Sequence, residues 1–337
     1  MSDFLNSYGK HEQPKDQEKS ETPAASNDFF ASYPVLSQQA DQNQKAQAIQ
    51  TSNTEPTPEM DVDLLFRELN SLIGLGRVKE EVRQLINFVK VQDMRRKNGL
   101  GRMDISLHSV FMGAPGTGKT TVARIYGKML NALGLLVKGH LVETDRPGLV
   151  GNYIGQTANK TDEKVKEAIG GVLFVDEAYS LYKGENAEWD YGNEAIEVLM
   201  KRMEDNRNNL AVIVAGYPEP MKKFLNSNEG FQSRFVNYIH FDDYTPEELI
   251  AIFESFCSQN TYVLHGNSME LAKIYLESAY VRRDERFGNA RAVRNFFEMI
   301  IRNQALRIGE TIKHPSIAQL KSIEPQDVYP LLNSETI

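Results

Sequence analysis

The segment Gly-Ala-Pro-Gly-Thr-Gly-Lys-Thr at residues 113–120 constrains the fold of this 337-residue chain more than any other feature. It lies between a short apolar run, 109–113, and a segment in which Val122, Ile125 and Met129 recur at helical spacing. Glycines let backbone N–H groups converge on phosphate oxygens, and the N-terminus of the helix adds a favourable dipole. The pattern therefore predicts a strand, a phosphate-binding loop and a helix, in that order.

The side chains of this loop suit the phosphates of a nucleotide. Lys119 can reach the outer phosphates with its ammonium group, and the hydroxyl of Thr120 can act as a ligand of Mg²⁺. A chance match to the loop pattern is expected in roughly one in a hundred chains of this length. The predicted nucleotide-binding residues of the loop are Ala114, Pro115, Gly116, Thr117, Gly118, Lys119, Thr120 and Thr121.

A second motif, Val-Leu-Phe-Val at 172–175, stands directly before Asp176 and Glu177. A fully apolar run that ends in adjacent acids is typical of a buried strand carrying carboxylates to the edge of a sheet where ligands bind. Asp176 suits Mg²⁺, directly or through water, and Glu177 suits polarising a water for attack on the γ-phosphate. An ordinary acidic turn is the alternative, and the phosphate-binding loop upstream favours the catalytic interpretation.

Further apolar runs at 141–144 and 210–215 alternate with helical segments, one of which is predicted from Gly76 to Asn98. That alternation is typical of a parallel sheet with helices on both faces. We therefore expect an α/β nucleotide-binding domain over residues 59–243.

The pattern changes after Thr245. Pro246 begins a predicted helix, and turns such as Gly266-Asn267 and Gly288-Asn289 separate three or four helices. A small helical domain is therefore expected over residues 244–337.

Residues 1–58 are rich in polar residues and proline and poor in branched aliphatic residues, so we expect a disordered tail. Two segments of this tail, 3–8 and 28–33, share the pattern Asp-Phe-(Leu/Phe)-x-Ser-Tyr. Paired aromatic residues in a polar tail suit a short motif that binds a partner, and coincidence is the alternative.

Composition excludes several classes of protein. With 46 acidic and 38 basic residues the net charge is −8, which argues against a nucleic-acid binder because neutralising phosphates needs a basic face. The one cysteine, Cys257, excludes an internal disulfide framework and suits a reducing compartment. No apolar run has the length of a membrane span, and the N-terminus lacks a signal-peptide core. We expect a cytoplasmic protein without membrane insertion.

The order of these motifs resembles AAA+ ATPases and, in detail, the CbbX/CfxQ and SpoVK-like group. The segments that carry the resemblance are LIGLGRVKEEV, GNYIGQTANKT, GGVLFVDEAYSLY, DYGNEAIEVL, AGYPEPM, GFQSRF and GNARAVRNFFE. The resemblance implies a P-loop NTPase fold with a five-stranded parallel sheet, followed by a helical lid. It also implies hydrolysis of ATP to ADP and phosphate, with Mg²⁺ as cofactor.

The resemblance assigns roles to residues outside the two motifs. Ile73-Gly74-Leu75 matches the segment that packs on adenine, with Gly74 a nucleotide-binding residue. Arg234 matches the arginine finger, which acts on the nucleotide of a neighbouring subunit and so implies a homo-oligomeric ring, expected to be a hexamer. Arg291 matches the sensor-2 arginine of the lid, and Arg294 competes with it for that role.

One position departs from the family pattern. Most AAA+ proteins carry a polar residue at the end of the fourth strand, where it positions the attacking water, but Gly216 and Tyr217 stand there. The group is similar at this place, so we do not infer an inactive enzyme, and the role stays unassigned. Tyr179, Tyr182 and Trp189 are expected to pack beside the Asp-Glu strand, with a second substrate-facing loop as the alternative.

The segment Gly-Asn-Tyr-Ile-Gly at 151–155 matches the pore loop of the family. Tyr153, with Ile154, would grip a polypeptide through ring contacts that tolerate almost any sequence. Gly151 and Gly155 would let the loop shift as the nucleotide state changes. The alternative is a tyrosine buried between the loop and the sheet.

Together these features favour an ATP-driven motor that pulls on or partly unfolds a protein client. In one branch of the family the client is Rubisco, from which an inhibitory sugar phosphate is released, but nothing in these residues selects that client. The alternative is a switch or scaffold, in which ATP only assembles a ring and the tail recruits partners. A DNA-acting ATPase is a third interpretation, disfavoured by the acidic charge balance.

Overall fold

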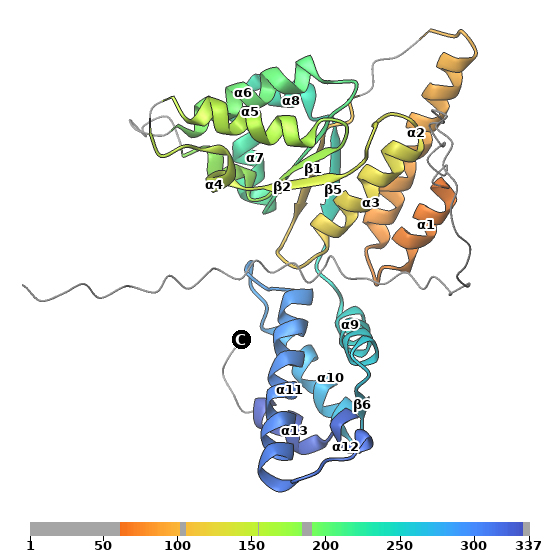
Figure 1. The fold of residues 1–337 in the computed structure, drawn as a ribbon, viewed down its shortest axis with the longest axis vertical. Coiled ribbons are helices and arrows are strands. Elements are labelled where there is room, and N and C mark those ends of the chain that lie inside the picture. Colours follow the sequence, from red (N-terminus) through yellow and green to blue (C-terminus); the bar gives the residue numbers. More distant parts are fainter. Residues whose placement is uncertain (1–60, 102–105, 154, 184–190, 333–337) are drawn as a thin grey trace, which may run out of the picture. The chain divides into compact units, whose positions relative to one another are not determined.

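The computed structural model describes residues 61–101, 106–153, 155–183 and 191–332 (Figure 1). The predictions for the N-terminal tail and its paired motifs, for Ile154 and for Trp189 lie outside these residues.

In the first part of the described chain, strands and helices alternate. The elements are α1 Val62–Ser71, α2 Gly76–Lys97, β1 Ser109–Gly113, α3 Lys119–Ala132, β2 Leu141–Thr144, α4 Arg146–Leu149, α5 Thr157–Ala168, β3 Val172–Val175, the 3-10 helix η1 Ala178–Leu181, α6 Gly192–Asp205, β4 Ala211–Gly216, α7 Pro218–Asn226, α8 Glu229–Arg234 and β5 Asn237–Phe241. The strands form one sheet in the order β2-β3-β4-β1-β5, with all neighbours parallel. The predicted α/β fold with a five-stranded parallel sheet is confirmed.

Helices cover both faces of this sheet (Figure 1). Side chains alternate along β1, so that Phe111 belongs to one buried cluster and its neighbour Val110 to the other. The first cluster joins the sheet to α1, α2 and α3, and the second joins it to α5, α6, α7 and α8. Strands buried on both faces must be apolar throughout, which is why continuous apolar runs predicted the inner strands correctly.

The edge strand β5 was not among those apolar runs. Ile239 and Phe241 are buried, whereas Tyr238 is exposed. Because a strand at the edge of the sheet keeps one side partly in water, its sequence alternates and gives a weaker signal than a central strand.

The second part of the described chain is helical, as expected, with Thr245 and Glu248 forming a capping box at its start. Its elements are α9 Pro246–Gln259, β6 Val263–Leu264, α10 Ser268–Val281, α11 Ala290–Thr311, α12 Ile317–Lys321, β7 Ser322–Ile323 and α13 Pro325–Leu332. Between residues 246 and 332 it thus has five helices where three or four were predicted, and a parallel two-residue strand pair that was not predicted. The helix α12 and the strands β6 and β7 are too short for a periodic pattern in the sequence to reveal them.

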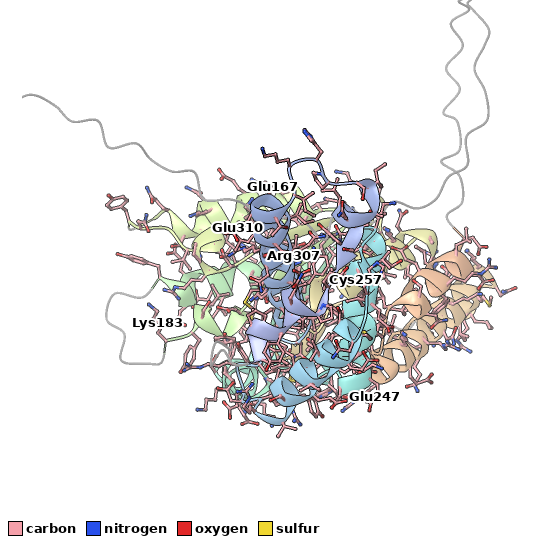
Figure 2. The ribbon with its side chains drawn as sticks, turned by 90° about the horizontal axis from the view of Figure 1, so that it is seen from below. Glu167, Lys183, Glu247, Cys257, Arg307 and Glu310 are labelled. Atoms are coloured by element: carbon pink, nitrogen blue, oxygen red, sulfur yellow. The ribbon has the colours of Figure 1, made fainter. Side chains whose placement is uncertain are left out.

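The helical part contains buried aromatic residues, which belong to the same cluster as the α1, α2 and α3 face of the sheet, and a buried ion pair. The rings of Tyr275 and Phe296 stack with centroids 3.9 Å apart, and Cys257 lies buried in the same cluster. Arg307 of α11, labelled in Figure 2, lies in the helical part. It donates two hydrogen bonds of 2.8 Å to the buried carboxylate of Asp327 in the first turn of α13. This fork geometry fixes α11 against α13 and raises the pKa of Arg307.

None of the helices within the described ranges has the length and apolar character that spanning a membrane requires.

Candidate nucleotide site

The glycine-rich loop joins the end of β1 to the start of α3, as its sequence predicted. Gly116 and Gly118 have φ angles of 71° and 90°, a region that residues with a Cβ rarely adopt. A Cβ on Gly113 would lie 2.4 Å from the carbonyl oxygen of Phe241 on the neighbouring strand. The loop therefore depends on glycine both for its curvature and for its packing on the sheet.

Lys119 lies inside this loop. Its Nζ donates hydrogen bonds to the carbonyl oxygens of Gly113 at 2.9 Å and Ala114 at 2.7 Å. Burial lowers the pKa of Lys119 to about 8, while the nearby charge of Asp176 raises it, that of Arg291 lowers it and that of Glu177 raises it. These four groups therefore act on one another electrostatically, although they come from distant parts of the sequence.

The two acids follow β3 directly. The N–H of Asp176 donates to the carbonyl oxygen of Thr144 at 2.8 Å, and the Oδ1 of Asp176 accepts from the N–H of Glu177 at 3.1 Å. Asp176 is half-buried and Glu177 is exposed. Glu177 has a φ of 47°, and such left-handed backbone at a residue other than glycine costs on the order of 1–3 kcal/mol. Strain of this kind is concentrated at functional sites.

The end of β4 lacks the polar side chain that most AAA+ proteins carry there. The ring of Tyr179, from η1, packs against Gly216 at this place. A Cβ on Gly216 would lie 2.7 Å from the Tyr179 ring, whose centroid is 6.2 Å from that of Tyr217. Burial, and then the charge of Glu177, raise the pKa of Tyr179 to about 12. Tyr179 and Tyr182 pack against the core cluster beside β3, as expected for aromatics at this place.

The segment predicted to meet adenine lies beside the loop. Gly74 and Leu75 have φ angles of 62° and 59°, and the side chain of Leu75 would lie 3.5 Å from a Cβ on Gly118. The Nζ of Lys79 donates to the carbonyl oxygen of Leu72 at 2.6 Å. The carboxylate of Glu248 on α9 would lie 2.5 Å from a Cβ on Gly74, and the φ of Gly74 is one that residues with a Cβ rarely adopt, so glycine is favoured here by its backbone angle.

The two arginines of α11 have different surroundings. Arg291 is exposed, and its charge acts on Lys119. Arg294 places its guanidinium 5.8 Å from the ring centroid of Phe256, within α9. Arg291, one of the two candidates for the sensor-2 role, is therefore in electrostatic contact with the loop.

Arg234 lies away from the loop. It ends α8, which leads into β5, and the first residue of β5, Asn237, pairs with Ser109, the first residue of β1. The loop starts at the opposite end of β1, about 13 Å away at 3.3 Å per residue. The guanidinium of Arg234 contacts Gly230 O at 3.2 Å and the carboxylate of Glu204 at 3.5 Å.

Tyr153 stands on a loop that is fixed at its base and open at its tip. Thr157 accepts a 3.1 Å hydrogen bond from the N–H of Gly151, and Thr161 donates one of 3.0 Å to Leu149 O. The Tyr153 side chain is 70% exposed, which contradicts the alternative of a tyrosine buried between the loop and the sheet. A Cβ on Gly155 would meet open space.

Sequence reasoning missed two residues that contact the loop from the helical part. The hydroxyl of Tyr244 donates to Thr117 O at 3.5 Å, and the side chain of Asn289 donates to Pro115 O at 3.4 Å. Asn289 belongs to the Gly-Asn-Ala-Arg segment, but only its arginine had a predicted role.

Two family models match these parts of the chain. Residues 109–243 match the ATPase family associated with various cellular activities (AAA), and residues 245–336 match the AAA lid domain. A chloroplastic ribulose bisphosphate carboxylase/oxygenase activase from Cyanidioschyzon merolae is 42% identical over 85% of this chain and 96% of that protein. The chain is an AAA+ ATPase.

Other relatives of this AAA+ ATPase lie in the predicted CbbX/CfxQ and SpoVK-like group. Protein CbbX from Cereibacter sphaeroides is 43% identical over 76% of this chain and 82% of its own length. Stage V sporulation protein K from Bacillus subtilis is 41% identical over 76% of this chain and 80% of its own length.

Among solved structures, the FIGL-1 AAA domain in complex with ADP has the same fold as this AAA+ ATPase. The two share a TM-score of 0.56 and 14% identity, covering 84% of this chain and 94% of that one.

Proposed function

We propose that this AAA+ ATPase is a motor that assembles as a homo-oligomeric ring, a hexamer, and remodels a protein client by hydrolysing ATP. The observation that carries the proposal is the separation of Arg234 from the phosphate loop. A guanidinium at the amino end of β5 is about a strand length from its own loop, so the nucleotide that it can reach belongs to a neighbouring subunit.

Within one subunit, the loop residues 114–121 hold the phosphates through backbone N–H groups, and Lys119 neutralises their charge. Gly74 lies where adenine packs. Glu177 accepts the proton of the attacking water, since its carboxylate stands beside the loop charges and is exposed to solvent. Arg291 carries the lid's charge to the same phosphates.

The oxygen donors of Asp176 and Thr120 suit Mg²⁺. The described residues contain no group of three or more His, Cys, Asp or Glu side chains able to hold a metal. Mg²⁺ suits such a site, because it keeps several waters and binds through one or two protein oxygens together with substrate phosphates. The carboxylate of Asp176 and the hydroxyl of Thr120 would hold it. When bound, it supplies positive charge to the β- and γ-phosphate oxygens.

The exposed Tyr153 supports the proposed contact with a client. A large ring that is exposed to this extent, on a loop with a fixed base, is available to side chains of another protein. One relative carries the name of a Rubisco activase. We propose a folded protein as the client class of this chain, bound in the channel of the ring together with Ile154.

The test is the ATPase rate per subunit, measured against protein concentration. If catalysis needs Arg234 of a neighbour, the specific rate rises with concentration as rings form, and Arg234→Ala removes turnover at every concentration. A specific rate that is independent of concentration in a monomeric sample would refute the ring. An assembled ring without turnover, also when client proteins are present, would favour the switch or scaffold.

A further inference from the structure

Asn289 is a fully buried polar residue in the turn that precedes α11. Its side chain joins three segments. The Oδ1 accepts from the N–H of Tyr244 at 3.0 Å, and the Nδ2 donates to the Oδ1 of Asp243 at 2.7 Å, both in the linker between β5 and α9. The Nδ2 also faces Phe287 O at 3.2 Å in its own turn and Pro115 O at 3.4 Å in the phosphate loop.

The local backbone shows that this bridge governs the conformation of Asn289. An asparagine that precedes a helix usually caps it, by accepting a hydrogen bond from an N–H of the first turn. Asn289 occupies that position before α11 but makes no such bond. Its φ of 49° and ψ of −124° are angles that residues other than glycine rarely adopt. Contacts outside the helix therefore hold this residue in place.

The neighbouring backbone strengthens the connection. The N–H of Ala290 donates to Gly116 O at 3.2 Å. A Cβ on Gly116 would lie 2.1 Å from Gly288 O, so the turn and the loop touch without space between them. Gly116 is thus required to be glycine by the lid as well as by its φ angle.

We propose that Asn289 is a positioning residue that couples the phosphate loop to the lid. This inference rests on the proposed nucleotide site. Phosphates would bind N–H groups of the loop, while the carbonyl oxygens of Pro115 and Gly116 in the same loop face the turn at 288–290. When nucleotide binding changes the loop, the carbonyl oxygens that accept hydrogen bonds from the turn therefore move, and the turn moves with them. The bonds of Asn289 to Asp243 and Tyr244 then pass that movement to the linker and α9.

The variant Asn289→Gly tests this coupling with little risk to folding, because glycine accepts the observed backbone angles and only the side-chain bridge is lost. Asn267→Gly is the matched control. Asn267 also precedes a lid helix, α10, and also makes no capping bond, but it is exposed.

Amide hydrogen exchange of α9 and α11 would be measured in the full chain, with and without a saturating, slowly hydrolysed ATP analogue and Mg²⁺. Binding of the analogue would be measured separately by fluorescence. We expect the nucleotide to slow exchange in the wild type and in Asn267→Gly. In Asn289→Gly, which should still bind the analogue, the slowing should shrink about fivefold or more.

A second pair of variants tests the bond to Asp243 itself. Asn289→Asp places two carboxylates together at the 2.7 Å contact and should lose the nucleotide response. Adding Asp243→Asn restores an amide opposite a carboxylate, but it does not restore the donor to Pro115 O, so the nucleotide response should stay lost.

The outcomes separate the two proposals. If Asn289→Gly binds the analogue and keeps the wild-type slowing, or accelerates exchange equally with and without nucleotide, the coupling role is refuted and Asn289 is merely structural. A full return of the nucleotide response when Asp243→Asn is added to Asn289→Asp would also contradict it, because the donor to Pro115 O is still missing. A wild-type chain that binds no analogue would overturn the proposed function together with this inference.

Discussion

The parallel strands of the central sheet give it a carboxyl edge, where the strands end, and an amino edge, where they begin. These two edges carry different charged residues. At the carboxyl edge, Lys119, Asp176 and Glu177 stand together with Arg291 of the lid, and their charges act on one another. At the amino edge, Arg234 ends α8 beside the start of β1, with Glu204 as the carboxylate next to its guanidinium. One edge therefore gathers the residues that we propose bind the nucleotide, and the other holds the arginine that we propose acts on a neighbour's nucleotide.

Each edge also contains a buried basic side chain, Lys119 at the carboxyl edge and His108 at the amino edge, and the two differ in protonation. Burial lowers the pKa of Lys119 to about 8, where the two nearby acids keep it charged at neutral pH. Burial lowers the pKa of His108 to about 4, with a hydrogen bond to the backbone of Met203 opposing the shift and the charge of Arg234 adding to it. His108 is therefore neutral and accepts the N–H of Val212 at 3.0 Å. The buried base of the amino edge is therefore neutral, whereas that of the carboxyl edge is charged.

The largest effect is expected at the amino edge. Arg234→Ala should lower kcat by about a thousandfold or more, since an arginine supplied by a neighbour stabilises charge on the transferred phosphoryl group. Steady-state ATPase assays at a concentration that supports rings would measure it. Arg207→Ala is the control, because Arg207 pairs with the same Glu204 at 3.5 Å. Equal losses in both variants would show that Arg234 only supports local structure.

Glu177→Gln should lower kcat by about a hundredfold or more while leaving nucleotide affinity largely intact, since it removes the proton acceptor but keeps the shape. Glu163→Gln, an exposed position on α5, should have no effect. Single-turnover assays with the enzyme in excess over nucleotide would separate chemistry from binding. Near-normal turnover in Glu177→Gln would assign the base elsewhere.

Mixing these two variants probes the split between the edges directly. Each is inactive alone, but a mixed ring contains interfaces with an intact Glu177 from one subunit and an intact Arg234 from the next. After random reassembly about a quarter of the wild-type rate should return. A mixture as inactive as its components would place both residues in the same subunit's site.

The neutral His108 predicts a pH effect on stability. Its pKa is about 4 in the folded chain and 6.5 when unperturbed, so the unfolded chain binds more protons between these values. The free energy of unfolding should therefore fall as pH drops from about 6.5 to about 4, by about 3 kcal/mol from this group. Urea unfolding of wild type and His108→Gln should show that the variant lacks this part of the slope. His265→Gln, at an exposed position, should retain it.

The smallest effect on hydrolysis is expected from Tyr153→Ala, because this loop belongs to the carboxyl side of β2 but makes no described contact with the site charges. Basal ATPase should be unchanged, while remodelling of a client is lost. Tyr329→Ala, another exposed tyrosine, is the control. A large loss of basal ATPase in Tyr153→Ala would mean that the loop supports the nucleotide site.

Much of the fold followed from local sequence, because the central strands are buried on both sides. The runs at 109–113, 172–175 and 210–215 agree with the inner strands β1, β3 and β4, and the helix predicted at Pro246 begins there. The run at 141–144 agrees with β2, although β2 is an edge strand. The edge strand β5 and the pair β6–β7 escaped, since a half-exposed strand and two-residue strands carry little pattern.

The site was predictable to the same degree and for the same reason. Lys119 and Glu177 lie in the contiguous motifs at 113–120 and 172–177, whose residue types indicate phosphate binding and proton transfer. Asn289 and Tyr244 were missed because their importance comes from contacts across 174 and 127 positions of sequence, and no local pattern reports such a contact. The packing of Tyr179 on Gly216 is likewise a property of the folded chain alone.

The buried thiol of Cys257 gives this chain a built-in chemical probe. It is the one cysteine of the sequence, it lies in α9, and burial raises its pKa to about 12. Only the thiolate reacts readily with disulfide and alkylating reagents, so modification should be slow until α9 leaves its partners. The rate at which the unmodified protein is labelled would then report how often the lid opens. No engineered reporter is needed, and each subunit has a single labelling site.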